Sequence, residues 1–282
     1  MGEFSSPFLL SDGNYLRARS YLMKAIKALG QHFLTDAGIA SRIADLGQIS
    51  AGERIWEIGP GHGILTDEIL SRGAHLEAFE LDSRMAKPLY KRFPEGLKLE
   101  IIDILKLDWA AQIASGDSPL KLIANIPYQI TSPLLYRLEA HHNSFSRIVM
   151  MIQKEVAERL SAGPGGKSYG PLTLRLALKY DIHSAFMVGK EYFEPVPKVD
   201  SMVITMTPRQ RLPIINHPEL FHTLIIRAFA HRRKTLRNNL LPMIGKDKLH
   251  KLESISTMDF GLRAQTLSEE DFICLSDLIA EL

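Results

Sequence analysis

The tetrapeptide Asn125-Ile126-Pro127-Tyr128 combines residue types that can bind and orient an aromatic amine. The side-chain oxygen of Asn125 can accept one N–H of the amine, and a backbone carbonyl at or before Pro127 can accept the other. Tyr128 offers a flat face on which a nucleobase can stack. The same four residues also suit an ordinary turn in which Tyr fills the edge of a sheet. The rest of the sequence must therefore decide between a reaction site and a turn.

A glycine turn, Gly59-Pro60-Gly61-His62-Gly63, offers a second binding element. It follows the alternating segment 54–58 and precedes a segment with helical spacing, which is how a nucleotide-binding βαβ unit begins. The spacing G-x-G-x-G differs from the dinucleotide pattern G-x-G-x-x-G, and an acid, Glu57, precedes it. We therefore expect Gly59 and Gly61 to contact a nucleoside without a pyrophosphate, although glycine turns also occur where nothing binds.

Two acids lie at the ends of the next two predicted strands. Glu80 comes 21 residues after Gly59, where a carboxylate can accept both hydroxyls of a ribose. Asp103 is placed to accept from an adenine amino group. For Glu80, a solvated carboxylate at a strand end is the alternative. Because Asn125 ends a further strand, the pattern predicts a nucleoside site at the carboxyl edge of a sheet.

The elements that must position these residues alternate between short apolar runs and amphipathic segments. We predict strands at 54–58, 75–79, 97–102, 120–124, 147–152, 181–188 and 201–207. We predict helices at 37–46, 64–72, 83–93, 154–160, 171–178, 218–230, 232–240 and 268–281, the first with an N-cap at Thr35-Asp36. This alternation predicts an α/β fold at residues 21–207, followed by a helical domain at 208–282 that begins near Pro208.

Composition and charge narrow the class of protein. The chain has 282 residues, 45% of them hydrophobic, and a formal net charge of +2, which suits a globular protein. Ten Lys or Arg but only two acids lie between positions 209 and 251, which indicates a surface for a polyanion. The single cysteine, Cys274, indicates a reduced, cytoplasmic setting. No apolar run is long enough to span a membrane, and the histidines lack metal-ligand spacing.

The segment Phe193-Glu194-Pro195-Val196-Pro197 is the last candidate. Its stiff prolines are expected to hold Phe193 near the carboxyl edge of the sheet, although packing alone would also explain a buried Phe. Residues 1–20 show no convincing periodicity, and we expect them to form a flexible extension or a remnant of cloning.

Six segments together resemble the ribosomal RNA adenine N6,N6-dimethyltransferases of the KsgA type. They are Gly30-Gln31-His32-Phe33-Leu34, Glu57-Ile58-Gly59-Pro60-Gly61, Asn125-Ile126-Pro127-Tyr128, Gln153-Lys154-Glu155-Val156, 193–201 and Arg232-Arg233-Lys234-Thr235-Leu236-Arg237-Asn238. The resemblance runs in order from about Gly30 to the C-terminus. It implies a Rossmann-like methyltransferase sheet of seven strands with a small helical domain, S-adenosyl-L-methionine as methyl donor, and no metal.

The resemblance also implies roles for single residues. His32, Leu34, Gly59, Glu80, Asp103 and Asn125 would contact the cofactor, while Asn125, Pro127 and Tyr128 would hold the target base. At His32 many relatives carry Asn, so a backbone contact is expected there. The implied substrate is a pair of adjacent adenines in a hairpin near the 3′ end of small-subunit rRNA, within a pre-assembled small subunit. We expect Arg232, Arg233, Lys234 and Arg237 to contact RNA phosphates, and the protein to be a monomer.

Two other functions use the same features. A nicotinamide oxidoreductase shares the βαβ opening but would show G-x-G-x-x-G and a separate catalytic centre. A non-catalytic RNA-binding or assembly factor could keep the fold, and such a role can coexist with an enzyme. The acceptors at Asn125 and Tyr128 favour an active methyltransferase.

Overall fold

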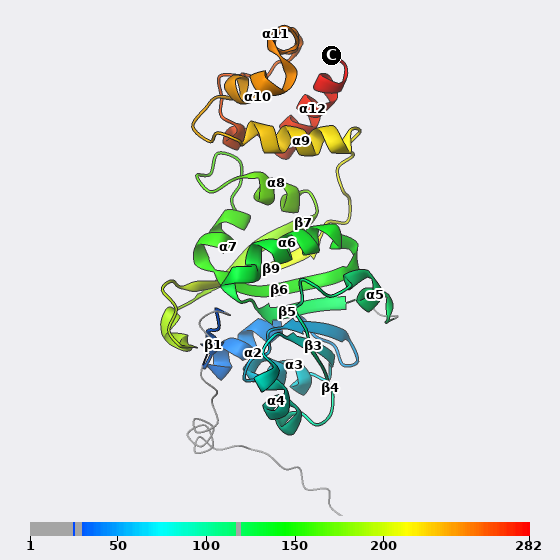
Figure 1. Cartoon of the computed structure of the whole chain (residues 1–282), viewed down its shortest axis with the longest axis vertical. Coiled ribbons are helices and arrows are strands. Elements are labelled where there is room, and N and C mark those ends of the chain that lie inside the picture. The colour runs from blue at the N-terminus through cyan, green and yellow to red at the C-terminus, as the bar shows by residue number, and fades with distance from the viewer. Residues whose placement is uncertain (1–24, 26–29, 117–119) are drawn as a thin grey trace, which may run out of the picture.

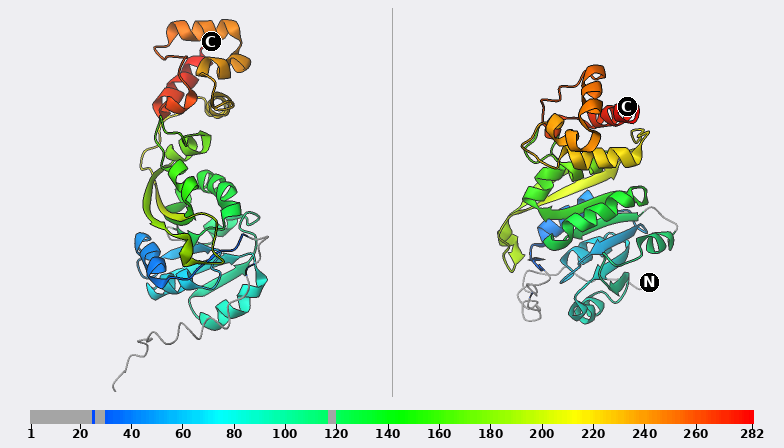
Figure 2. Two further views of the ribbon diagram at one scale, coloured as in Figure 1. Left: turned by 90° about the vertical axis from the view of Figure 1, so that its left-hand side faces the viewer. Right: turned by 45° about the horizontal axis from the view of Figure 1, so that its top comes forward.

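The computed structural model describes residues 25, 30–116 and 120–282 (Figure 1). The extension expected at residues 1–20 lies outside these described residues. An α/β part forms one end of the molecule and a set of helices forms the other, as the two views of Figure 2 show. Among the described residues, no helix is both long enough and apolar enough to cross a membrane.

The α/β part is built on one mixed sheet of seven strands in the order β4-β3-β2-β5-β6-β9-β7. The strands are β2 (Arg54–Ile58), β3 (His75–Glu80), β4 (Leu97–Ile101), β5 (Leu120–Asn125), β6 (Phe145–Gln153), β7 (Tyr180–Val188) and β9 (Ser201–Pro208). Neighbours from β4 to β6 pair in parallel, whereas β9 is antiparallel to both β6 and β7. The predicted Rossmann-like α/β fold is confirmed.

The strand order places the switch point of the sheet between β2 and β5. From β2 the chain moves outward to β3 and β4, and it then returns to β5 on the other side. Ligands of such sheets bind in the crevice at this point, beyond the carboxyl ends of the strands. The glycine turn follows β2, and Asn125 ends β5, so the fold brings the two strongest motifs of the sequence together.

Helices cover both faces of the sheet. They are α2 (Ala37–Leu46), α3 (Ile64–Ser71), α4 (Ala86–Arg92), α5 (Trp109–Ala114), α6 (Thr131–Ala140), α7 (Lys154–Leu160) and α8 (Pro171–Ala177). Successive residues of β2 serve opposite faces: Ile55 packs in the core that contains Ile43 and Ile69, and Trp56 packs in the core that contains Trp109 and Phe145. All five residues of β2 are buried, as expected for a parallel strand covered on both sides.

Helix α2 has the predicted bounds, and the Asp36 side chain caps it by accepting from the N–H of Ile39 at 2.8 Å. The short helices α5 and α6 were not predicted. A two-stranded sheet was also not predicted: β1 (Phe33–Leu34) pairs antiparallel with β8 (Phe193–Glu194) and joins the N-terminal segment to the segment after β7.

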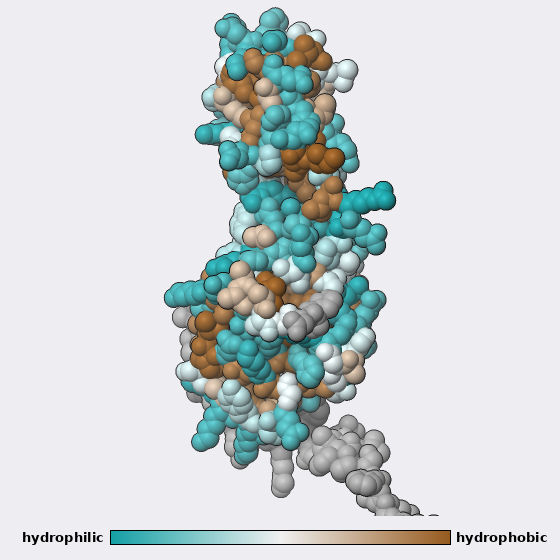
Figure 3. All heavy atoms as spheres, turned by 90° about the vertical axis from the view of Figure 1, so that its right-hand side faces the viewer, coloured by the Kyte–Doolittle hydropathy of each residue, from teal (hydrophilic) through white to brown (hydrophobic). Residues whose placement is uncertain are grey.

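The C-terminal helices are α9 (Pro218–Ala228), α10 (Leu236–Ile244), α11 (Lys246–Ile255) and α12 (Glu269–Ala280). They share a second core around Phe229, Leu240 and Phe272, and α8 contributes Leu174 to it. The prediction of a helix at 232–240 was wrong at its start, because Thr235 caps α10 and residues before it form a turn. On the face in Figure 3, the waist between the two ends is mostly hydrophilic. A domain boundary near Pro208 stays a prediction.

Candidate active site

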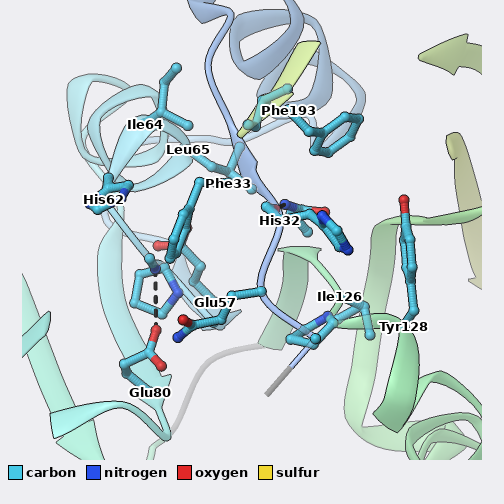
Figure 4. A pocket seen from close by; sticks show the side chains of 18 residues that line it. His32, Phe33, Glu57, His62, Ile64, Leu65, Glu80, Ile126, Tyr128 and Phe193 are labelled. Carbon is cyan, nitrogen blue, oxygen red and sulfur yellow. Dashed lines mark hydrogen bonds between the residues drawn. The ribbon is translucent and has the colours of Figure 1, made fainter. Parts of the chain in front are cut away.

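A pocket opens at the carboxyl ends of β2, β3 and β5 (Figure 4). The predicted cofactor-binding residues that line it are His32, Leu34, Gly59, Gly61, Glu80 and Asn125. Pro127, Tyr128 and Phe193, the other predicted catalytic residues, line it as well. In Figure 4, Glu80 and Tyr128 lie on opposite sides of the pocket, with His32 between them. The fold thus gathers residues from five distant segments into one place.

Asp103 is the one predicted cofactor-binding residue that is not among those lining this pocket. Strand β4 ends at Ile101, and Asp103 lies in the turn that follows. Its Oδ1 accepts the N–H of Leu105 at 3.0 Å, so the carboxylate stabilises that turn. A contact between Asp103 and an adenine stays a prediction.

Asn125 has an amide orientation that its partner determines. The Nδ2 group donates to the backbone carbonyl of His32 at 3.3 Å. Because a carbonyl can only accept, the NH₂ end of the amide must face His32. The Oδ1 atom is therefore left to accept from a ligand, which is the role that the sequence predicts for it.

Gly59 and Gly61 shape the turn after β2. Both have positive φ angles, 68° and 56°, which residues other than glycine rarely adopt. A Cβ atom on Gly61 would also come within 2.8 Å of the ring of Phe33. The turn is fixed to its neighbours, since the N–H of Gly59 donates to the carbonyl of Phe79 at 2.9 Å.

Glu80 joins this turn to the loop after β3. Its Oε2 accepts the N–H of Gly61 at 3.2 Å, and its Oε1 accepts the N–H of Asp82 at 2.8 Å. Burial raises the pKa of Glu80, while the backbone N–H groups oppose that rise and the charge of Asp82 adds to it. A carboxylate oxygen has two acceptor sites, so both oxygens can still accept a ribose hydroxyl.

Glu57 is a pocket residue whose contact the sequence analysis missed. It is only 1% exposed, and the hydroxyl of Thr66 donates to its Oε2 at 2.7 Å. Burial raises the pKa of Glu57 to about 8, and the nearby Glu80 adds to the rise, whereas the bond from Thr66 opposes it. Glu57 is therefore mostly protonated at neutral pH. Its place two residues before Gly59 was the available signal.

The segment 31–35 crosses the pocket and is held at both ends. At one end, Nε2 of Gln31 donates to Asp82 at 3.1 Å. At the other, the N–H of Thr35 donates to the carbonyl of Tyr192 at 2.9 Å. His32 lies between them, and its Nδ1 is 2.6 Å from the carbonyl oxygen of Pro195, so this nitrogen carries the proton and donates. The side chain of His32 thus braces the segment, and its carbonyl orients Asn125.

Tyr128 and Phe193 occupy the other end of the pocket. The hydroxyl of Tyr128 lies 2.8 Å from Oγ of Ser201, and its ring centroid is 5.6 Å from that of His32. Burial raises the pKa of Tyr128, so its hydroxyl stays neutral at physiological pH. Phe193 is 3% exposed and belongs to the core that contains Ile43. It therefore forms a wall of the pocket with little surface of its own.

The four predicted RNA-binding residues are not equivalent. Arg232 donates to the carbonyls of Lys167 and Tyr169, which holds the loop before α8. Arg237 forms an ion pair with Glu253 at 2.8 Å. All four are exposed, and Arg232, Arg233 and Lys234 line a surface hollow in the turn before α10. Among the described residues, the side chains of Arg233 and Lys234 form no hydrogen bond or ion pair, and their contact with phosphate stays a prediction.

The described residues contain no cluster of three or more side chains that could hold a metal ion. Cys274 is exposed on α12, far along the chain from the pocket. His62 lies in the glycine turn and lines the pocket, and its ring centroid is 4.1 Å from that of Phe33.

Comparisons with known proteins agree with this geometry. The family model described as "Ribosomal RNA adenine dimethylase" matches residues 23–281. Proteins named "Ribosomal RNA small subunit methyltransferase A" are similar to the chain: that of Geobacter sulfurreducens is 41% identical over 90% of this chain and 95% of its own, and that of Lactobacillus delbrueckii is 36% identical over 93% of each.

Solved structures share the fold. A dimethyladenosine transferase from Plasmodium falciparum has a TM-score of 0.71 at 28% identity, over 86% of this chain and 96% of its own. The 23S rRNA methyltransferase ErmE has a TM-score of 0.69 at 21% identity, over 88% and 99% of the two chains, and shows the fold alone.

Proposed function

Since the chain belongs to the ribosomal RNA adenine dimethylase family, we propose that it transfers methyl groups from S-adenosyl-L-methionine to the N6 amines of two adjacent adenines in small-subunit rRNA. The observation that carries this proposal is the juxtaposition of two half-sites at the switch point of the sheet. The glycine turn with Glu80 forms the half for the cofactor, and Asn125 to Tyr128 form the half for the base.

The pocket fits the chemistry of this cofactor. S-adenosyl-L-methionine carries a cationic sulfonium, an ammonium group and a ribose with two hydroxyls, and it supplies the methyl group. Glu80 offers oxygens for the hydroxyls, and Glu57 adds a second buried acid at the same pocket. The pocket lining includes Gly59 and Gly61, which have no side chain to stand between a ligand and the turn. A ligand can therefore approach the backbone there closely.

Asn125 and a neighbouring carbonyl would activate the target amine. The lone pair of an adenine amine is delocalised into the ring, which makes the nitrogen a poor nucleophile. The Pro127 carbonyl already accepts the N–H of Ile130 at 3.1 Å, so we assign the second acceptor role to the carbonyl of Ile126. Two acceptors on the amine hydrogens favour a pyramidal nitrogen whose lone pair faces the methyl group.

Tyr128 would hold the base by stacking, an interaction worth about 1–3 kcal/mol for aromatic side chains. After the first transfer, the nitrogen releases one proton to solvent, keeps one hydrogen and regains a lone pair. A single acceptor bond can then orient it for the second transfer. The product of the complete reaction is therefore N6,N6-dimethyladenine, and no covalent enzyme intermediate is needed.

The substrate is proposed on the names of the relatives and on the charge of the C-terminal helices. Arg233 and Lys234 would contact phosphates next to the target. The target would be a hairpin near the 3′ end of small-subunit rRNA in a pre-assembled subunit, and the enzyme would act as a cytoplasmic monomer.

Methyl transfer to isolated ribosomal subunits tests this function. The protein is incubated with tritiated S-adenosyl-L-methionine and either small or large subunits from cells that lack the modification. We expect label in the rRNA of the small subunits only. Label in the large subunits alone would show that the substrate is not small-subunit rRNA. Label in neither, with a protein that binds the cofactor, would refute the proposed activity.

A further inference from the structure

Ser201 is a fully buried hydroxyl residue that the proposed reaction does not use. Its exposed fraction is 0%, and it is the first residue of β9. Its backbone lies opposite Gln153 on β6 and Val188 on β7. Because it is paired on both sides, the position of Ser201 is set by the sheet and not by the pocket.

The hydroxyl of Ser201 contacts the hydroxyl of Tyr128 at 2.8 Å. Tyr128 follows β5 and opens the short 3₁₀-helix η4 (Tyr128–Ile130). In the sheet, β6 lies between β5 and β9. The side chain of Tyr128 therefore reaches across the end of β6, and its far end is held by a residue from another part of the chain.

This bond fixes the direction and plane of the Tyr128 ring. The hydroxyl oxygen lies on the axis of the ring, so a bond to a fixed partner fixes where that axis points. A phenolic hydrogen prefers the plane of the ring, so the same bond also limits rotation of the ring about its axis. Stacking depends on both quantities, because the two rings must lie nearly parallel in an offset arrangement.

We propose that Ser201 is the positioning residue for Tyr128, which it holds as the stacking face for the target adenine. This inference rests on the proposed function. Ser201 touches neither cofactor nor base in this role, and it acts through the ring alone. The β5 segment supplies the aromatic face, and β9 supplies its anchor, so the base site depends on two strands that are not neighbours.

A double-mutant cycle tests the proposal. Ser201→Ala and Tyr128→Phe each remove one half of the same bond, so either is expected to lower kcat/KM for RNA about 3- to 10-fold, as the loss of one hydrogen bond does. Because the bond can be lost only once, the double variant should be no worse than the poorer single variant. The dissociation constant for S-adenosyl-L-methionine should stay unchanged in all three variants.

Thr205→Val is the matched control, because it removes another buried hydroxyl from β9 without touching the pocket. It should keep the kinetic constants of the unchanged protein. Two results would overturn the role of Ser201: a Ser201→Ala variant with unchanged kcat/KM, or losses that multiply in the double variant.

A binding measurement separates this inference from the proposed function. An RNA hairpin with 2-aminopurine in place of the target adenine reports stacking by loss of fluorescence on binding. We expect less quenching with Ser201→Ala than with the unchanged protein or Thr205→Val. Equal quenching would overturn the role of Ser201 even if methyl transfer is observed. An unchanged protein that quenches but transfers no methyl group would instead overturn the proposed function.

Discussion

Glu80 stabilises the pocket and faces it with the same carboxylate. Its two oxygens hold the backbone of Gly61 and Asp82, and their remaining lone pairs are the proposed acceptors of ribose hydroxyls. Replacement of Glu80 therefore has two effects, on the ligand and on the turn, and a test must separate them.

We predict that Glu80→Ala weakens binding of S-adenosyl-L-methionine by about 1.5–3 kcal/mol, the usual size for loss of hydrogen bonds to a charged group. Titration calorimetry measures this change. Glu80→Gln is the matched control, because it keeps one acceptor oxygen and the shape of the side chain, and its loss should be smaller. Unchanged affinity in a folded Glu80→Ala variant would remove this residue from the cofactor site.

Glu57 makes stability depend on pH in a direction opposite to that of most surface carboxylates. Burial raises its pKa from 4.5 to about 8, so the folded state holds a proton that the unfolded state releases above about pH 4.5. Its contribution to the free energy of unfolding is complete below that pH and declines as the pH rises to about 8.

Glu57→Gln stays uncharged at every pH and should remove this dependence. We predict that, relative to this variant, the unchanged protein becomes less stable between pH 5 and 8, by at most about 1.4 kcal/mol for each pH unit. Urea unfolding of both proteins at several pH values measures the difference. Parallel stability curves would show that Glu57 is ionised in the folded protein.

The sequence predicted which residues form the site better than it predicted their contacts. Asn125 and the glycines could be found from the sequence because each motif ends a strand, and strand ends of a parallel sheet meet. The role of the His32 side chain could not be predicted, since its hydrogen-bond partner Pro195 is 163 positions away in the sequence. The bond between Tyr128 and Ser201 was hidden for the same reason.

At the scale of elements, the seven strands of the large sheet were predicted, whereas the strands β1 and β8 and the helices α5, α6 and α11 were not. Strands β1 and β8 contain two residues each, too few to show a period. Helix α6 begins at Thr131 without a side-chain cap, so no start signal marked it. Helix α5 did have a signal, because Asp108 caps it through the N–H of Ala111 at 3.1 Å. The helix predicted at 232–240 starts four residues late because Thr235 is its cap.

The basic residues in and beside the turn before α10 are predicted to contact RNA. Arg232, Arg233, Lys234 and Arg237 are all exposed, but Arg232 and Arg237 also contact other parts of the protein. Neutralising Arg233 and Lys234 together should reduce the slope of log affinity for RNA against log salt concentration by about 1.5–2, because two phosphate contacts are lost. Filter binding at several salt concentrations measures the slope.

Lys87 and Lys91 on α4 provide the control, since they are exposed at the opposite end of the molecule (Figure 1). Replacing both with Ala makes the same change in charge and should leave the slope as it is. If both double variants lower the slope equally, the turn before α10 is not a phosphate site and only net charge matters.

The whole molecule consists of a sheet that positions chemistry at its edge and a helical end that carries exposed basic residues. The two ends have separate cores, around Trp56 and around Phe272, and α8 connects them by adding Leu174 to the second core. Amphipathic periodicity predicted most helices of both ends. It did not predict that α8 packs on the C-terminal helices, because periodicity shows which face of a helix is buried but not which element covers that face.

Product analysis of extensively reacted RNA tests the central claim most directly. Small subunits lacking the modification are incubated with the protein and excess S-adenosyl-L-methionine, and the rRNA is digested and its nucleosides are identified by mass spectrometry. We predict N6,N6-dimethyladenosine, at two adjacent residues per subunit, and none with Asn125→Ala after the same reaction time. Monomethyladenosine as the only product at completion, or methyl groups on other bases, would contradict it.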